Sequence, residues 1–323
     1  MGRMMLLDFI ISFCRDKIPG HGEDSYCYSF CDTAGLLGAF DGCGGAGART
    51  HSCYSNRTEA FMASRLCAGA FYDHFRSLFP GDHDPSRLAG EVFAPRTLER
   101  LVKFSPPKDE NGFQIRGSSI RTLPTTAAVA LIQQQNDGTS LVTAIWAGDS
   151  RVYVLDANGL AQLTVDDTTV TDPMINIYED GILKNIMCSD KPVKLHCTTI
   201  RMNQPFIVFS ATDGCFGYLS TPMEFEGLFL ETLLATKCAA DWEEKLAESI
   251  GSVAGDDHTL CLAAYGFGSY PMLQRHFANR STYLQERYLC HVRNMPLEDR
   301  ESRFKLWESY RDNYMRYTKG GLL

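Results

Sequence analysis

The sequence predicts an α+β fold in which antiparallel β-sheet packs against separate amphipathic helices. Two observations support this class: short runs rich in Val, Ile and Phe recur along the chain, and tight turns join successive runs into hairpins. Strands in hairpins with independent helices do not fit an alternating βαβ arrangement. We therefore expect layers of antiparallel sheet and helix.

The predicted strands are short and are joined by tight turns. A first strand lies in the apolar segment that ends at Cys14, and further strands are expected at residues 26–30, 36–40, 127–133, 141–147, 152–155, 206–211 and 260–265. The turns at residues 136–138 and 157–159 contain Asn and Gly, the residues that hairpin turns prefer. Consecutive hairpins predict antiparallel pairing.

Three helices are predicted between these strands. Apolar side chains recur at helical spacing from Met62 to Leu78. Thr221 is placed to cap a second helix, because Pro222 follows at the first helical position and Glu224 completes a capping box. A third helix covers residues 240–250 and ends before glycine.

Composition narrows the class of protein. The 323-residue chain is 44% hydrophobic and 22% charged, with a net charge of −8 and a pI near 5.5. An acidic chain without a Lys/Arg run argues against nucleic-acid binding. The N-terminal apolar run is interrupted by Asp8 and is far shorter than the ~20 residues that span a bilayer, so we expect no membrane association. Twelve scattered cysteines without zinc-ligand spacing favour reduced thiols and a cytoplasmic location.

The C-terminal tail differs in composition from the rest of the chain. Residues 269–323 carry ten Lys or Arg against six Asp or Glu, so the tail is +4 while the remainder is −12. Aromatic side chains recur in the tail at helical spacing. We expect a domain over residues 1–268 and a helical extension over 269–323 that packs on the domain or on a protein partner.

Four acidic motifs share one pattern, in which an apolar run ends in Asp beside a small residue. They are AFDGCGG with Asp41, WAGDSR with Asp149, FSATDGCFG with Asp213, and AGDDHT with Asp256 and Asp257. Each motif alone is better explained as a turn. Together they favour carboxylates that converge at one edge of a sheet, where glycine lets backbone carbonyls approach. Oxygen ligands of this kind suit Mg²⁺ or Mn²⁺.

A pair of such ions predicts phosphoryl hydrolysis. Two metals about 3.5–4 Å apart hold a bridging water, lower its pKa and aim it at phosphorus, so that no protein nucleophile is needed. The alternative, in which GCGGAG is a nucleotide-phosphate loop, lacks the Gly-Lys-Ser/Thr that would follow it.

In motif order the chain resembles the metal-dependent serine/threonine protein phosphatases of the protein phosphatase 2C type, as a bacterial-like member, over roughly residues 8 to 266. The matching segments are Glu23-Asp24 as an acidic pair on the first strand, Asp41-Gly42-Cys43-Gly44-Gly45, Thr125-Thr126-Ala127, Gly148-Asp149-Ser150-Arg151, Asp213-Gly214 and Asp256-Asp257. The resemblance implies a β-sandwich of two antiparallel sheets flanked by helices on both faces, with a dinuclear Mn²⁺ or Mg²⁺ site in a cleft at one end.

The resemblance also implies roles for the principal site residues. Asp41 would bridge both metals, and the carbonyl of Gly42 would bind one of them. Asp213 and Asp256 would bind the other. Asp41, Asp213 and Asp256 are therefore the residues expected to carry catalysis.

Further ligands are implied around this centre. Glu23 and Asp24 would contribute through metal-bound waters, and Asp149 would hold a third, weaker ion. Gly217 stands where many members place another aspartate, which weakens the third-metal assignment.

Two more departures from the family pattern bear on function. Cys43 stands where many eukaryotic members have a histidine and bacterial relatives often have methionine, so we expect a metal-bound water to protonate the leaving group. Cys43 is then a small apolar filler or, alternatively, a redox handle. No arginine precedes Glu23 at the usual spacing; Arg15, Lys17 and His21 are candidate phosphate-binding substitutes, although each is more simply a solvated side chain.

Other polar residues near these motifs receive structural interpretations. His258 is expected to be a strand residue and not a ligand, because hard cations prefer oxygen. Asp166 and Asp167 are interpreted as a turn that closes a strand. Residues 168–190 are expected to form a flap beside the cleft.

The sequence therefore predicts hydrolysis of phosphoserine or phosphothreonine in a phosphoprotein substrate by water activated at two Mn²⁺ or Mg²⁺ ions. The alternative is a pseudophosphatase, in which the same fold serves as a regulatory binding module. The missing arginine and Cys43 favour that alternative. The retained aspartates oppose it, because crowded carboxylates repel one another without a cation between them.

Overall fold

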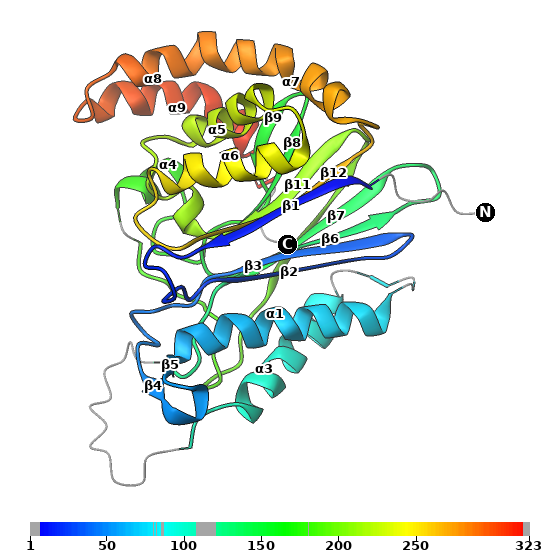
Figure 1. Ribbon diagram of the computed structural model, residues 1–323, viewed down its shortest axis with the longest axis vertical. Helices are drawn as coiled ribbons and strands as arrows, with labels where there is room; N and C mark the ends of the chain where they lie inside the picture. The colour runs from blue at the N-terminus through cyan, green and yellow to red at the C-terminus, as the bar shows by residue number, and fades with distance from the viewer. Residues whose placement is uncertain are drawn as a thin grey trace.

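The computed structural model describes residues 7–79, 81, 83–84, 87–107, 121–179 and 181–318. Two five-stranded antiparallel sheets form a sandwich (Figure 1). The first sheet has the order β1 (Leu7–Arg15), β12 (His258–Tyr265), β11 (Phe206–Ala211), β8 (Arg151–Asp156) and β9 (Gly159–Gln162). The second has the order β10 (His196–Met202), β7 (Ser140–Ala147), β6 (Ala127–Gln134), β3 (Ala34–Phe40) and β2 (Ser25–Phe30). The predicted α+β sandwich is thus confirmed.

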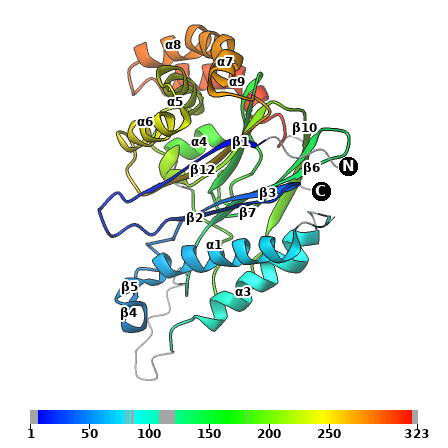
Figure 2. The same cartoon turned by 45° about the vertical axis from the view of Figure 1, so that its right-hand side comes forward.

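Helices cover the outer face of each sheet (Figures 1 and 2). Helix α1 (Glu59–Leu78) and helix α3 (Ala94–Lys103), with the π-helix η2 (Leu88–Phe93) before it, lie on the β2–β3–β6 side. Helix α5 (Pro222–Ala235) and helix α6 (Ala239–Gly251) lie on the β1–β12–β11 side. A short ribbon of β4 (Thr50–His51) and β5 (Arg57–Thr58), with the 3₁₀ turn η1 (Ser52–Tyr54) between its strands, precedes α1.

The core has three layers because each sheet is apolar on both faces. Between the sheets, Leu37 and Trp146 of one sheet pack with Val154 and Phe206 of the other. Strands β3, β11 and β12 are fully buried along their lengths, which explains why they read as continuous apolar runs in the sequence. Within the described residues, none of the helices combines the length and hydropathy needed to cross a membrane.

Threonine side chains cap the first turns of α1 and α5, and the cap of α5 by Thr221 was predicted. Thr58 caps α1 by accepting a hydrogen bond from the backbone N–H of Phe61 at 3.1 Å. Thr221 caps α5 by accepting from the N–H of Glu224 at 3.3 Å, with Pro222 as the first helical residue. Glu224 does not close the reciprocal half of a capping box; its carboxylate accepts from the hydroxyls of Ser220 and Thr221.

Two segments with weak periodicity were not predicted. Strand β10 lies at the edge of its sheet and is half exposed, so its sequence HCTTIRM has no apolar alternation strong enough to detect. The η2–α3 segment begins with a π-helical turn, which disturbs the 3.6-residue spacing of apolar positions.

The described residues after β12, here called the C-terminal extension, contain α7 (Tyr270–Leu284), the π-helix η4 (Gln285–Leu289), α8 (Cys290–Asn294) and α9 (Arg300–Tyr314). These helices lie outside α5 and α6 (Figure 1). Trp307, Tyr310 and Tyr314 are each 1% exposed and share one apolar cluster with Phe209 of β11 and Phe225 of α5. Residues 319–323 of the tail and residues 1–6 of the N-terminal apolar segment lie outside the described residues.

A buried ion pair also joins the extension to the body. Glu226 of α5 is fully buried, and Arg280 of α7 donates to its two carboxylate oxygens at 2.6 and 2.8 Å. The hydroxyl of Tyr310 donates to the same carboxylate. The charge of Glu226 is therefore satisfied entirely from the extension.

Candidate active site

Strand ends from both sheets meet at one end of the sandwich, and the predicted site residues follow or precede them. Phe40 at the end of β3 pairs with Ser25 at the start of β2, so Asp41 and Asp24 continue from paired strand ends. Ala211 at the end of β11 pairs with Leu260 near the start of β12, which brings Asp213 to the turn before β12. Antiparallel register thus places side chains that are far apart in the sequence at one edge.

The backbone around Asp41 is fixed by the neighbouring strand. Its carbonyl accepts from the N–H of Thr126 at 2.8 Å and from the hydroxyl of Thr125 at 2.6 Å. The Thr126 hydroxyl is itself 2.6 Å from that of Ser150. These contacts leave the carboxyl group of Asp41 to face the cavity.

Gly42 is required at its position by close backbone approach. A Cβ atom there would lie 2.6 Å from the carbonyl oxygen of Ala60 and 2.7 Å from that of Glu23. Gly214 is equally confined, since its Cβ would lie 1.8 Å from the carbonyl oxygen of Asp257. Both glycines of the Asp-Gly pairs therefore permit the loops of the site to touch one another.

Glu23 and Asp24 lie in the loop between β1 and β2, not on the first strand as expected. Strand β1 ends at Arg15, and a turn follows in which Gly20 has φ +80° and His21 donates to the carbonyl of Ile18. The Pro19-Gly20 pair stops the strand before the acidic residues are reached. Glu23 nevertheless reaches the site, where the Thr58 hydroxyl donates to its carboxylate.

Asp24 lies behind the cavity and is 2% exposed. Its carboxyl group accepts from the hydroxyl of Thr212 at 2.8 Å, the residue immediately before Asp213. Burial, together with the nearby carboxylate of Asp213, raises the pKa of Asp24 to about 8 despite that hydrogen bond. The neutral form of Asp24 is therefore favoured in the metal-free chain, compared with an ordinary aspartate.

A cavity of about 760 Å³ lies at this end of the sandwich. Its described lining includes the backbone of Gly42, Gly44 and Gly45, and the acidic side chains Glu23, Asp41, Asp149, Asp213, Asp256 and Asp257. Five of the predicted ligand side chains and Gly42 thus line one space, and only Asp24 among the predicted ligands lies outside its lining. The aspartates that the sequence singled out are brought together by the fold.

The carboxylates of the cavity affect one another. Burial and the charges of Asp24, Asp213, Asp149 and Asp256 raise the pKa of Asp41 well above its ordinary value. Burial and Asp256 raise the pKa of Asp213 to about 6. Such repulsion is relieved by bound cations, so the electrostatics of the cavity favour metal binding.

The donor set fits a hard divalent cation, although it is not preassembled around one. Within the described residues, no group of three His, Cys, Asp or Glu side chains is already arranged as a metal site. The cavity nonetheless presents carboxylate and carbonyl oxygens from five separate loops, and Oδ1 of Asp149 is buried without a hydrogen-bond partner in the described part of the chain. Oxygen donors of this kind suit Mg²⁺ and Mn²⁺.

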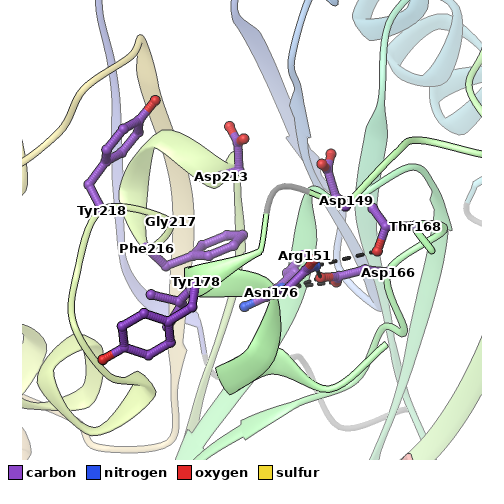
Figure 3. Close-up of a pocket in the computed structure, with 12 residues that line it drawn as sticks. Asp149, Arg151, Asp166, Thr168, Asn176, Tyr178, Asp213, Phe216, Gly217 and Tyr218 are labelled. Atoms are coloured by element: carbon purple, nitrogen blue, oxygen red, sulfur yellow. Dashed lines mark hydrogen bonds and ion pairs between the residues drawn. The ribbon is translucent and has the colours of Figure 1, made fainter. Parts of the chain in front are cut away.

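A second cavity of about 340 Å³ adjoins the first and shares Asp149, Gly181 and Asp213 with it (Figure 3). Arg151 and Asp166 form a buried ion pair in its wall, with Nε and Nη2 donating at 2.9 and 2.7 Å. Figure 3 shows the carboxyl groups of Asp149 and Asp213 projecting to the same side, away from this pair.

Asp166 and Asp167 have larger roles than the predicted turn. Asp166 also accepts from Asn176 of helix α4 (Pro173–Tyr178) at 2.6 Å, which ties that helix to the ion pair. Asp167 accepts from Asn185 at 2.7 Å and contacts His196 of β10 at 2.9 Å. The predicted turn is therefore wrong: both aspartates hold neighbouring segments in place. The hairpin pairing of β8 with β9 brings Asp166 next to Arg151.

The predicted flap is anchored from both the site and the C-terminal extension. Thr125 and Met187 exchange backbone hydrogen bonds at 2.9 Å in each direction. On the other side, Trp307 of α9 donates to Asp172, the residue that caps α4, at 3.3 Å. Residue 180 of the flap lies outside the described residues.

The three candidate phosphate-binding residues lie elsewhere. Arg15 and His21 are exposed, and the ammonium group of Lys17 donates to the carbonyl of Ala254 at 2.6 Å. None of the three belongs to the described lining of the cavity, whose cations are instead Arg121, Lys184 and Lys191. Arg121, Lys184 and Lys191 belong to no recognisable motif, so they could not be predicted from the sequence.

The remaining predictions concern single residues beside the aspartates. His258 begins β12 and is buried against the ring of Phe13, in agreement with a strand residue. Cys43 lines the larger cavity, and burial together with the charges of Asp41 and Asp149 raises the pKa of its thiol well above the ordinary value. Gly217 lines the smaller cavity.

The two-sheet sandwich has the fold of bacterial PPM serine/threonine phosphatases. No family model matches the sequence, and no curated protein matches it. Solved structures do match: the serine/threonine phosphatase Stp1 from Staphylococcus aureus superposes with a TM-score of 0.57 at 18% identity, covering 82% of this chain and 98% of that one. The Mycobacterium tuberculosis phosphatase PstP/Ppp gives 0.55 at 18% identity, covering 81% and 99%.

A third structure, the catalytic domain of PstP in complex with two manganese ions, gives a TM-score of 0.53 at 18% identity and covers 80% of this chain and 98% of its own. These matches confirm the predicted resemblance and fold class. At this level of identity they establish the fold, and the chemistry of the present chain is argued from its own residues.

Proposed function

We propose that this chain is a metal-dependent phosphatase that hydrolyses phosphoserine or phosphothreonine in proteins. The observation that carries the proposal is that Asp41, Asp213 and Asp256, which follow or precede three different strands, line one cavity. The charges of the two others contribute to the raised pKa of Asp41, as expected where carboxylates share a cation site.

Two Mn²⁺ or Mg²⁺ ions would be held by Asp41, the carbonyl of Gly42, Asp213 and Asp256. When bound, such ions lower the pKa of water and stabilise the negative charge that develops on a phosphoryl group. The chain supplies the oxygen donors and fixes them through the threonines that hold the backbone of Asp41. Asp149, whose Oδ1 has no partner among the described residues, would hold a weaker third ion.

Other residues orient the site. Thr58 holds the carboxylate of Glu23 in the lining of the cavity, where it is placed to accept hydrogen bonds from water, and Thr212 holds Asp24 behind the cavity. Cys43 is a neutral thiol at neutral pH in the metal-free chain and does not act as a nucleophile. The proton for the leaving group then comes from water.

We propose that residues 1–268 form the catalytic domain and that 269–323 form an extension that packs on it. The apolar cluster shared by Trp307 and Phe225, and the Arg280–Glu226 ion pair, support this arrangement. The twelve cysteines all lie within the described residues and are all free thiols, consistent with our proposal of a cytoplasmic protein.

The test is turnover of a phosphothreonine peptide with Mn²⁺, with chelator, and with the isosteric Asp213→Asn variant. We expect activity that requires the metal and that falls at least about 100-fold in the variant, because a ligand is lost while the packing is kept. Turnover that is unaffected by chelation would refute the mechanism. A folded chain that binds metal or phosphopeptide without turnover would favour the pseudophosphatase. The presence of Cys43, a departure from the family pattern, is the observation that supports this alternative.

A further inference from the structure

The charged residues that line the larger cavity come from two different parts of the chain. The carboxylates belong to strand ends and to the loop before β2. The cations Arg121, Lys184 and Lys191 belong to the segments 121–124 and 181–191 beside the cavity. Ile182, Leu183 and Ile186 lie among the cations in the same lining.

Backbone contacts fix the segments that carry these cations. The N–H of Lys184 donates to the carbonyl of Asp167 at 2.7 Å, and Asn185 beside it donates to the side chain of Asp167. Ser189 donates to the carbonyl of Thr122 at 2.9 Å, which brings the chain around Arg121 next to the chain around Lys191. Residues 121–124 and 181–191 therefore form one anchored surface, here called the platform, and it carries the three cations.

The two lysines are available to a ligand. Within the described part of the chain, neither Lys184 nor Lys191 forms an ion pair. Lys184 is exposed and its neighbour Ile182 is 73% exposed, so this part of the platform lies at the mouth of the cavity. The aspartates that would hold metal lie on the loops at the strand ends.

We infer that Lys184 and Lys191 bind acidic side chains that flank the phosphorylated residue, so that the preferred substrates are acidic phosphopeptides. This inference rests on the proposed function of the cavity. A phosphoryl group must reach Asp41, whereas adjoining peptide residues pass the mouth, where Lys184 is carried. Lysine is a flexible point charge that pairs with carboxylates without strict geometry, and Ile182 offers an apolar contact between such pairs.

Binding is measured by fluorescence anisotropy in Mn²⁺, with peptides in which a non-hydrolysable phosphonate replaces phosphoserine. One peptide has Glu on both sides of this residue, and its partner has Gln. We expect the Glu peptide to bind roughly tenfold more tightly, and the preference to shrink at high salt. The Lys184→Gln/Lys191→Gln variant should bind the two peptides equally. This readout needs no turnover, so it is separate from failure of the proposed catalysis.

A matched control is Lys194→Gln, which removes an exposed lysine that follows this segment and is not in the described lining of the cavity, and this variant should keep the preference. Equal affinity of the wild-type chain for both peptides would overturn the inference, as would a preference that survives in the double variant. A loss of p-nitrophenyl phosphate turnover in the double variant as large as its loss of affinity for the Glu peptide would also overturn the inference, because it would mean that the lysines bind the phosphoryl group itself.

Discussion

The carboxylate of Asp257 accepts a hydrogen bond from the backbone N–H of Glu23 at 2.7 Å, and its other oxygen accepts from the N–H of Lys17 at 2.7 Å. Asp257 thereby holds the β1–β2 loop against the start of β12. Its neighbour Asp256 lines the same cavity but makes no comparable contact with that loop in the described structure. Two adjacent aspartates thus have different roles, one structural and one as a candidate ligand.

Substitution separates these two roles. Asp257→Ala should lower the free energy of unfolding of the metal-free chain by about 1–2 kcal/mol, because two backbone donors lose their acceptor. Asp256→Ala should leave that free energy unchanged or raise it, because it removes a repelling charge. Urea denaturation in chelator measures both, and equal losses would contradict the assignment.

The raised pKa values predict how stability depends on pH. The folded-state pKa values of Asp24, about 8, and Asp213, about 6, exceed the ordinary value of 3.8. At pH values between the ordinary and the raised pKa, the folded metal-free chain therefore binds more protons than the unfolded chain. Stability from these groups is therefore present at low pH and is lost as pH rises toward 8. We expect the melting temperature in chelator to fall by roughly 3–6 °C between pH 5.5 and 8.

Mn²⁺ should reverse this loss, and most strongly at pH 8, because metal binding requires ionised carboxylates. Asp213→Asn is the matched control. It removes one repelling charge, so at pH 8 it should melt above the wild type in chelator and gain little from Mn²⁺. A wild-type melting temperature that rises with pH in chelator contradicts the proposed repulsion.

The ion pair between Arg280 and Glu226 predicts that the C-terminal extension is needed for stability. Arg280→Met leaves Glu226 fully buried without its charged partner, which should cost about 3–5 kcal/mol. Chemical denaturation followed by tryptophan fluorescence gives the value.

The double variant Glu226→Gln/Arg280→Met serves as the control. It removes the uncompensated charge and keeps the size of both side chains, so it should recover most of the loss. If the single and double variants are equally unstable, the loss of stability comes from the packing of the Arg280 side chain and not from its charge. A single variant as stable as wild type would contradict the stabilising role of the ion pair.

Cys43 should be less reactive than its position suggests. Its thiol pKa is raised by burial and by Asp41, so little thiolate forms near pH 7.5. In the metal-free chain, iodoacetamide should label the exposed thiols Cys53 and Cys238 well before Cys43, as followed by mass spectrometry. Preferential labelling of Cys43 would support the redox alternative.

The sequence predicted the fold and the acidic centre because both depend on local signals. Buried strands read as apolar runs, and each aspartate sits where such a run ends. The hairpin turns were sufficient to predict antiparallel sheet. The division into two sheets was predicted from the family resemblance. Strand β10 was missed because one exposed edge strand carries little apolar patterning.

Long-range contacts account for what the sequence did not predict. The partner of Arg151 is decided by hairpin register, and the partner of Glu226 by how the extension packs. Lys184 and Lys191 belong to no motif, and only the anchoring of the flap brings them to the cavity. Asp257 differs from Asp256 only through contacts with a loop more than 200 residues away.

The most direct test of the metal centre is a calorimetric titration of the metal-stripped chain with Mn²⁺. Wild type should bind two ions per chain with release of protons, and Asp41→Asn, shown to be folded by circular dichroism, should lose both because it would bridge them. Absence of binding by the folded wild-type chain, or an unchanged stoichiometry in Asp41→Asn, would contradict the account.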